Sequence, residues 1–363
     1  MEAAVVIYSA AGDPHAAAVA WALHKNGTPH RIQPSIRKDE KTRLSIHVGE
    51  TADTVTYEDL EIINIRSSWY RRPLKPQAGS CHEADQSFIQ EQWQCLQKNI
   101  FDVADNLISS LWVNRPRAAL FAESKLAQLQ AARAAGMQIP ETLIGNNAPD
   151  IASLIERHGK VVFKTFYPHS WQSEHSGTTY DVGVAMLDGG SDLPEQAIAL
   201  SPGIYQRYID KAFDIRVTII GGKLFSAKIQ RAGGGGYVDW RPHSYDEDIR
   251  FENFAIGIAL EGKLQNLMNR LGIVFGCVDL AVDHLGDVYF LEVNQAGQFL
   301  FMEEALPELP LTRAMAAMLS TGRTDYGIGD CVEVRLADYL RTDEYRSLPP
   351  VPSNIGPRVT VEP

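Results

Sequence analysis

Two carboxylates and one amide near the C-terminal end of the sequence could together bind a divalent cation. The stretch VYFLEVN places Glu292 and Asn294 two residues apart. Both should lie on one face of a strand, because successive side chains alternate between faces. A second apolar stretch, CVDLAVD, contains Asp279 and is separated from the first by HLGD, which is the pattern of a β-hairpin.

The register of this predicted hairpin decides whether Asp279 joins the other two residues. The register favoured here pairs His284 with Asp287. Asp279 then lies directly opposite Glu292, whereas a shift by one residue would turn Asp279 to the other face. Adjacent carboxylates repel each other unless a cation lies between them, and Mg²⁺ takes such oxygen ligands together with substrate phosphates. The alternative is a surface hairpin with solvated acids.

Cationic side chains within other apolar stretches point to an anionic ligand. Lys164 lies inside VVFKTF, where a buried ammonium is costly unless it meets an anion or reaches solvent at a sheet edge. The sequence FDIR places Asp214 and Arg216 on one strand face. Arginine suits phosphate or carboxylate, and a cross-strand ion pair is the other interpretation. Lys125 stands at the start of a predicted helix.

The elements that would carry these residues divide the chain into four expected parts. Residues 1–115 begin with the strand AAVVIYSA and the helix DPHAAAVAWALHKNG, which together indicate an α/β unit. Residues 116–200 are expected to form a small α+β domain, and residues 201–330 are dominated by predicted strands. Residues 331–363 end in a proline-rich stretch, which predicts a weakly ordered tail or a strap.

Two segments could close over a bound ligand. The stretch RAGGGGY holds four consecutive glycines at 233–236, and residues 169–181 are polar and without periodicity. Such segments can fold over a site and exclude water, although a glycine run is more often only a flexible turn.

Composition narrows the classes of partner. The net charge of −11 argues against bulk attraction to nucleic acid or acidic membranes. No apolar run in the sequence approaches the ~18 residues of a membrane span, and the N-terminus lacks the basic region of a signal peptide. The four cysteines have neither metal nor redox spacing, which favours a reducing compartment. We therefore expect a cytoplasmic protein without a nucleic-acid or membrane partner.

The order and spacing of these segments resemble the ATP-grasp ligases, and among them most the graspetide synthetases, which are microviridin-type peptide macrocyclases. The segments concerned are SSWYRRP, SKLAQLQAARAAGMQIPETLI, YQRYIDKAFDIRVTIIGGKLFSAKI, VDWR and the hairpin. The resemblance implies an α/β (α+β) protein with the ATP-grasp fold. Its expected parts are an N-terminal α/β pre-ATP-grasp domain, a small central α+β domain and a C-terminal antiparallel-sheet domain that holds Mg²⁺ and ATP.

The resemblance also implies roles for individual residues. The expected Mg²⁺ ligands are Asp279, Glu292 and Asn294. The residues expected to bind ATP are Lys125, Lys164, Gln206, Tyr208, Ile209 and Glu292. The residues expected to act on the substrate and the transferred phosphoryl group are Arg216, Lys164 and Arg241. Two positions depart from the family pattern. Arg207 stands where an acidic residue is usual, and Gln295 stands where a proline usually follows the asparagine.

The activity implied by the resemblance is that of an ADP-forming ligase. It would activate a side-chain carboxylate of a ribosomal precursor peptide as an acyl phosphate and join it to a hydroxyl or an amine, giving a macrocyclic ester or amide. The implied partners are the leader and core of that peptide, and a second copy of the chain in a homodimer. One alternative is a ligase that joins an amino acid to a small molecule or a protein tail. Another is a catalytically weak module that binds nucleotide or peptide.

Overall fold

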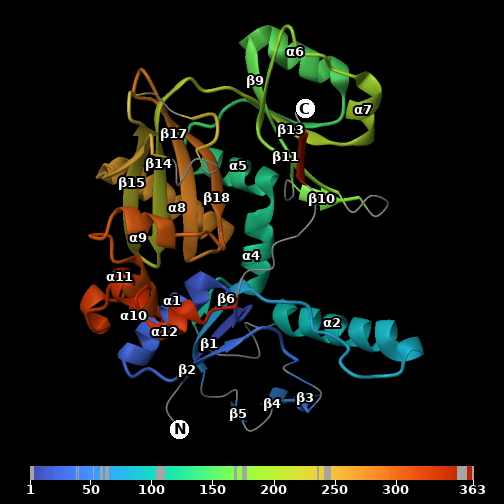
Figure 1. Cartoon of the computed structure of the whole chain (residues 1–363), viewed down its shortest axis with the longest axis vertical. Coiled ribbons are helices and arrows are strands. Elements are labelled where there is room, and N and C mark those ends of the chain that lie inside the picture. Colours follow the sequence, from blue (N-terminus) through green and yellow to red (C-terminus); the bar gives the residue numbers. More distant parts are fainter. Residues whose placement is uncertain are drawn as a thin grey trace.

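Three sheets of four or five strands form the framework of the computed structural model (Figure 1). In the view of Figure 1 the N-terminal sheet lies at the bottom, the C-terminal sheet at the upper left and the middle sheet at the upper right. The structure describes residues 4–37, 39, 41–51, 53–57, 60–61, 65–103, 111–166, 170–173, 178–234, 237–240, 247–349 and 358–361.

The N-terminal sheet is parallel and has the strand order β2–β1–β6–β7. Its strands are β1 (Ala4–Ser9), β2 (His30–Gln33), β6 (Ile65–Arg72) and β7 (Leu111–Val113). Helix α1 (Pro14–Lys25) begins after Asp13, whose side chain accepts hydrogen bonds from two backbone N–H groups of the first turn, as an N-cap does. Helix α10 (Leu311–Thr321) comes from the far end of the chain and packs against α1 and β6. The expected α/β unit is present, and a distant helix completes it.

The middle sheet is antiparallel and has the order β12–β9–β13–β8. Its strands are β8 (Thr142–Gly145), β9 (Lys160–Lys164), β12 (Ala185–Asp188) and β13 (Gly203–Arg207). Helices α6 (Ala148–His158) and α7 (Glu195–Leu200) share a buried apolar core with this sheet. Strand β13 begins beyond residue 200 but pairs with β9 and β8. We propose that the middle domain extends to Arg207.

The C-terminal sheet is antiparallel and has the order β16–β15–β14–β17–β18. Its strands are β14 (Lys211–Ile220), β15 (Lys223–Arg231), β16 (Ile249–Asn253), β17 (Phe275–Asp283) and β18 (Val288–Asn294). One face shares a core with α4 (Pro116–Glu123), α5 (Lys125–Ala134) and α8 (Ile258–Leu271). Helices α4 and α5 lie within residues 116–200, yet they cover the C-terminal sheet.

The turn between β17 and β18 differs by one residue from the predicted turn. The backbone N–H of Asp283 donates to the carbonyl of Asp287 at 3.1 Å, so His284 lies in the turn and does not pair with Asp287. The side chain of Asp283 also accepts hydrogen bonds from the backbone of Leu285 and Asp287. The predicted turn register is therefore wrong. The prediction treated all four residues of HLGD alike, whereas the hydrogen bonds of Asp283 place the start of the turn one residue earlier than expected.

A β-bulge at Leu291 restores the predicted pairing. Leu280 pairs with Phe290, whereas Asp279 pairs with Glu292, so Leu291 is an extra residue on β18. The bulge places Phe290 and Val293 in the apolar core, and Glu292 consequently lies on the opposite face beside Asp279.

The remaining described elements lie at the edges of this framework. They are β3 (Leu44–Val48), β4 (Asp53–Tyr57), β5 (Leu60–Glu61), η2 (Glu83–Asp85), α2 (Gln86–Asp102), β10 (Ser170–Gln172), β11 (Thr179–Val182), α9 (Leu300–Ala305), η4 (Ile328–Asp330), α11 (Leu336–Tyr339), α12 (Asp343–Arg346) and β19 (Arg358–Val361). In the C-terminal extension, Tyr339 packs against Trp21 of α1, and β19 pairs with β11. No helix in the described ranges is long and apolar enough to cross a membrane.

Candidate functional site

A row of three charged side chains crosses the C-terminal sheet. Arg216 of β14 pairs with Asp279 of β17, which in turn pairs with Glu292 of β18. Directly paired residues share a face of the sheet, so all three side chains project on the face opposite the α8 core. Arg216 Nη1 lies 2.7 Å from Asp279 Oδ2, and the two residues are 4% and 6% exposed, respectively. Arg216 thus holds Asp279 in a fixed position inside the site.

Lys125 supplies the cation at the other end of this row. Its Nζ lies 2.5 Å from Glu292 Oε2, with both side chains partly exposed. Lys125 is the first residue of α5, which begins at the N-cap Ser124, whose hydroxyl accepts a hydrogen bond from Ala127. The capping residue therefore sets where the helix starts and where the lysine emerges.

The donor set on this face fits Mg²⁺. Asp279 and Glu292 are directly opposite each other, and Asn294 lies two residues further along β18 on the same face, opposite Cys277. Two carboxylates and an amide oxygen are ligands that Mg²⁺ accepts. Asn294 is exposed, and its Oδ1 accepts a hydrogen bond from the backbone of Ala296 at 3.2 Å. The described residues contain no group of three or more His, Cys, Asp or Glu side chains that could hold a metal ion. A metal site here would therefore need the amide of Asn294 in addition to the two carboxylates.

Lys164 belongs to an internal strand of the middle sheet and not to a sheet edge, because β9 pairs with β12 and β13. Its Nζ donates to Gln206 Oε1 at 2.9 Å, and Gln206 Nε2 donates to Thr142 Oγ1 at 2.9 Å. Gln206 is buried. This chain of hydrogen bonds across three strands orients the ammonium, and the edge-lysine interpretation does not apply.

The segment expected to meet adenine connects the middle and C-terminal sheets. Tyr208 donates its backbone N–H to the Lys160 carbonyl at 3.1 Å, and Ile209 is buried with Tyr289. The Arg207 guanidinium lies over the ring of Tyr289 at 5.2 Å. Arg207, which replaces the usual acidic residue, therefore packs on β18.

A cleft of about 950 Å³ is lined by parts of all three sheets. Its charged lining residues are Arg71, Arg72, Lys125, Lys164, Glu123 and Glu292. Cations outnumber anions there although the whole chain has a net charge of −11, so the local field favours an anionic ligand. The cleft brings together Lys125, Lys164, Gln206, Glu292 and Asn294. A smaller cavity of about 30 Å³ shares Lys164 and Glu292 with it and reaches Asp279.

The loop that follows β18 is held through its carbonyl groups. The carbonyl of Gln295 accepts a hydrogen bond from Asn114, and the carbonyl of Ala296 accepts from Arg71 and Arg72. The carbonyl of Gly297 accepts from Arg71, and that of Gln298 accepts from Arg216. The donors come from the N-terminal and C-terminal sheets and from the segment between β7 and α4. Gln295 Nε2 also donates to Glu123 at 3.2 Å, a contact that the usual proline could not make.

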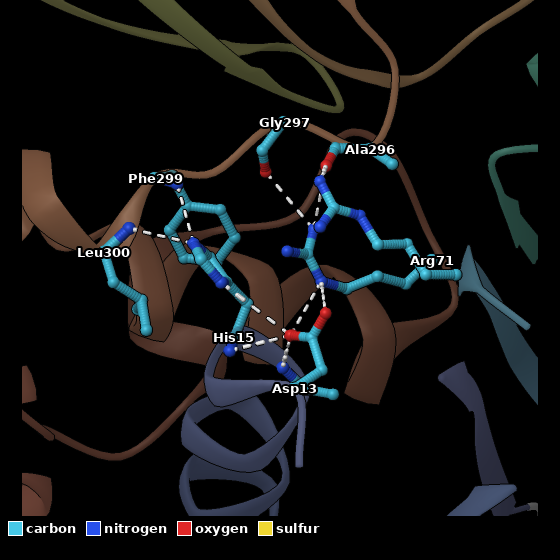
Figure 2. Close-up of polar contacts among 9 residues, drawn as sticks. Asp13, His15, Arg71, Ala296, Gly297, Phe299 and Leu300 are labelled. Carbon is cyan, nitrogen blue, oxygen red and sulfur yellow. Dashed lines mark hydrogen bonds and ion pairs between the residues drawn. The ribbon is translucent and has the colours of Figure 1, made fainter. Parts of the chain in front are cut away.

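Figure 2 shows how this loop is joined to the start of α1. Arg71 Nε donates to Asp13 at 3.0 Å, while its Nη1 donates to the carbonyls of Ala296 and Gly297 at 3.2 Å each. His15 Nε2 accepts hydrogen bonds from the backbone of Phe299 and Leu300. Burial, and next the nearby Arg71 guanidinium, lower the pKa of His15 to about 2, so the imidazole is a neutral acceptor.

Sequence reasoning missed this network. Its only local signal was the basic and aromatic end of the strand SSWYRRP, which here places Tyr70, Arg71 and Arg72 in the cleft wall. Arg241 lies outside the described residues, as do residues 169, 174–177 and 235–236 of the two expected lid segments.

No protein-family model matches this sequence, and no curated protein matches it. Solved structures do match. The macrocyclase MdnC of Microcystis aeruginosa MRC, bound with precursor peptide MdnA, superposes with a TM-score of 0.69 at 21% identity, over 87% of this chain and 98% of that chain. A RiPP-associated ATP-grasp ligase of Chryseobacterium gregarium, in complex with ADP and a leader and core peptide, gives 0.72 at 21% identity, over 88% and 96%.

A third match is the ATP-grasp ligase PsnB, complexed with a minimal precursor variant, Mg and ADP. Its TM-score is 0.66 at 16% identity, over 89% of this chain and 99% of that chain. The parallel N-terminal sheet and the antiparallel middle and C-terminal sheets follow the expected arrangement. The fold expected from the resemblance is therefore confirmed, and this chain has the ATP-grasp fold.

Proposed function

We propose that this protein is an ATP-dependent, ADP-forming ligase that activates a carboxylate as an acyl phosphate. The observation that carries the proposal is the row Arg216–Asp279–Glu292, in which Glu292 lines a cation-rich cleft together with Lys125 and Lys164, and Asp279 lines the small cavity beside it. Carboxylates aligned with cations on a rigid sheet suit phosphoryl transfer, in which positioning and charge stabilisation supply most of the rate.

The same geometry supports a set of residues that would hold Mg²⁺ and ATP. Asp279, Glu292 and Asn294 would bind Mg²⁺, which would reduce the negative charge on the phosphates when bound. Lys125 and Lys164 would contact the phosphate oxygens as point charges. Gln206, which is buried and lines the cleft, would contact the adenine. Tyr208 and Ile209, which follow it in the connection between the sheets, are proposed to do the same.

The reaction would proceed in two steps. The substrate carboxylate attacks the terminal phosphorus of ATP, and ADP leaves. Arg216, whose guanidinium is fixed by Asp279 and by the Gln298 carbonyl, stabilises charge on the transferring group and on the carboxylate. A hydroxyl or amine then attacks the acyl carbon, and phosphate leaves. Because water would compete at this point, closure of the cleft is valuable; Arg241 and the segments at 169–181 and 233–236 are proposed to contribute there.

The proposed substrate is a ribosomal precursor peptide whose core receives ester or amide crosslinks. All three matching structures named above contain a precursor peptide, a variant of one, or a leader and core peptide, and one of those proteins is described as a macrocyclase. A wide cleft with an excess of cations would accept the acidic side chains of such a core. We further propose that the enzyme acts as a homodimer.

The test uses purified protein with ATP, Mg²⁺ and a short peptide encoded next to its gene. Each crosslink removes one water, so mass spectrometry should show losses of one water with one ADP formed per loss. Glu292→Gln should abolish both, whereas Glu252→Gln, an exposed position on β16 of the same sheet, should not.

Other outcomes would identify the alternatives. A gain in mass from an added amino acid would indicate a ligase that joins separate molecules. Binding of nucleotide or peptide without any ADP formation would indicate a binding module and would overturn the proposal.

A further inference from the structure

A buried ion pair lies beside the charged row on the floor of the site. Lys211 Nζ is 2.7 Å from Asp214 Oδ1, and the two side chains are 6% and 2% exposed. Both residues line the small cavity of about 30 Å³, which shares Lys164, Leu291 and Glu292 with the main cleft. The pair therefore belongs to the same enclosed space as the proposed Mg²⁺ ligands, although none of the roles assigned above uses it.

The second carboxylate oxygen of Asp214 sets this pair apart from a plain structural ion pair. Asp214 Oδ2 is buried and accepts no hydrogen bond from any residue that the structure describes. Leaving a buried carboxylate oxygen without a donor is unfavourable, and a buried polar atom of this kind calls for a physical explanation. Lys211 thus holds one oxygen, while the other has no donor, in a carboxylate that lines the cavity.

The position of Asp214 in the sheet places it next to the reacting groups. Asp214 and Arg216 lie on one face of β14, about 7 Å apart along the strand. Arg216 is opposite Asp279, and Asp214 is opposite Ala281, whose methyl group occupies little of the space above the sheet. Asn294 lies on the other side of the Arg216–Asp279 row. A group bound beside Arg216 would therefore have Asp214 on one side and Asn294 on the other.

The second step of the proposed reaction needs a proton acceptor, because a hydroxyl or an ammonium must lose a proton as it forms the new bond. Three other titratable side chains of the site are engaged in contacts. Asp279 and Glu292 contact Arg216 and Lys125, and His15 accepts two backbone hydrogen bonds away from the row.

We propose that Asp214 accepts, on Oδ2, the proton of the hydroxyl or amine that attacks the acyl phosphate; this assignment rests on the proposed ligase function. The bond from the nucleophile to the acyl carbon forms while the bond from that carbon to the phosphate oxygen breaks. Phosphate leaves with the electron pair, and the proton passes to Asp214. Lys211 orients the carboxylate by holding Oδ1.

The electrostatics of the pair agree with this role. Burial raises the pKa of Asp214 to about 6, while the neighbouring Lys211 opposes the rise. The carboxylate is thus ionised near neutral pH and more basic than an exposed aspartate, as an effective proton acceptor must be.

The experiment separates the two steps by changing the nucleophile. Hydroxylamine attacks acyl phosphates without help from a base, so it reports the first step as a peptide hydroxamate. We expect Asp214→Asn to lower the crosslinking rate by about 100-fold or more, while its hydroxamate formation and ATP affinity stay near wild type. The matched control is Glu303→Gln, which replaces a buried carboxylate away from the cleft and should retain both reactions.

A second variant guards against a folding defect. In Asp214→Ala, added formate should restore part of the crosslinking, because it can enter the space of the lost carboxylate. Equal loss of crosslinking and hydroxamate formation in a folded Asp214→Asn protein would overturn the assignment, as would wild-type crosslinking in that variant. Absence of both hydroxamate and ADP with the wild-type protein would instead overturn the proposed ligase function and the assignment with it.

Discussion

Two carboxylates lie side by side in this site because each has its own cation. Repulsion between Asp279 and Glu292 would favour protonation of one of them. Arg216 and Lys125 offset that repulsion from opposite ends of the row. Single residues thus decide the charge of the site, and their proposed roles can be tested one at a time.

The first prediction at this scale concerns Lys164. We expect Lys164→Ala to weaken ATP binding by about tenfold or more, because a hydrogen bond between charged groups is worth ~1.5–3 kcal/mol. Isothermal titration calorimetry measures the affinity. Lys160→Ala, at the exposed start of the same strand, is the control and should leave it unchanged. Unchanged affinity in Lys164→Ala would remove this lysine from the nucleotide site.

The second prediction concerns Glu303, which links α9 to Thr312 of α10 through hydrogen bonds of 2.8 and 2.6 Å. Burial raises its pKa from 4.5 to about 7 despite those hydrogen bonds. Between these two pH values the folded state binds a proton that the unfolded chain releases, so the stability falls as pH rises through this window. At ~1.4 kcal/mol per pKa unit the loss is about 3 kcal/mol.

Glu303→Gln removes this titration. We therefore expect the free energy of unfolding of the variant to gain about 3 kcal/mol relative to wild type between pH 4.5 and pH 8, as measured by urea denaturation at both pH values. A difference between the two proteins that does not vary with pH would contradict the raised pKa.

At the scale of elements, the bulge at Leu291 and the loop after β18 shape the site. The bulge turns Glu292 away from the core that holds Phe290 and Val293. The loop then passes so close to β17 that Gly297 has no room for a side chain. A Cβ there would meet Cys277 at 2.5 Å, a separation that packed atoms do not tolerate.

We expect Gly297→Ala to lower the free energy of unfolding by about 1–3 kcal/mol, the range for overpacking, and to reduce turnover by displacing the loop. Gly262→Ala on the exposed face of α8 has open space and should instead raise stability by about 0.5–1 kcal/mol, since glycine disfavours a helix. Thermal and urea unfolding of both variants checks the opposite signs. Equal effects would show that contact with Cys277 is not what excludes a side chain.

At the scale of the whole molecule, the N-terminal sheet is part of the site. Arg71, which is fully buried, joins Asp13 at the start of α1 to the carbonyls of Ala296 and Gly297. Helix α10 adds a second connection, because Arg66 and Ser67 of β6 donate to its carbonyl groups. Movement of this sheet relative to the C-terminal sheet would therefore disturb the loop directly.

We expect Arg71→Lys to lower the free energy of unfolding by about 3 kcal/mol, because lysine keeps the charge beside Asp13 but loses the planar fork that reaches two carbonyls. Arg66→Lys on the same strand loses a single carbonyl contact and should lose about 1 kcal/mol. Urea denaturation compares the two variants. Equal losses would show that the fork of Arg71 is not needed to hold the loop.

The sequence by itself determined which side chains share a strand face, because alternation depends only on neighbouring residues. Glu292 with Asn294 and Asp214 with Arg216 follow from spacing alone, and with the resemblance they led to the fold. The predicted register of the turn between β17 and β18 is wrong by one residue. Asp279 nevertheless pairs with Glu292, because the bulge at Leu291 compensates for that one-residue shift. A bulge has no clear mark in the sequence, since it arises from packing against the helices beneath.

Only the tertiary structure decided what surrounds these residues. The partners of Arg71 lie 225 and 226 residues away in the chain, and no local pattern reports such a contact. No local pattern reports the hydrogen bonds from Asn114 and Arg216 to the carbonyl groups of the loop either. The same is true of the cavity that Asp214 lines. Short-range alternation selects the face on which a side chain lies. Burial and partners depend on how distant elements pack, and the site draws on three sheets that meet only in the folded chain.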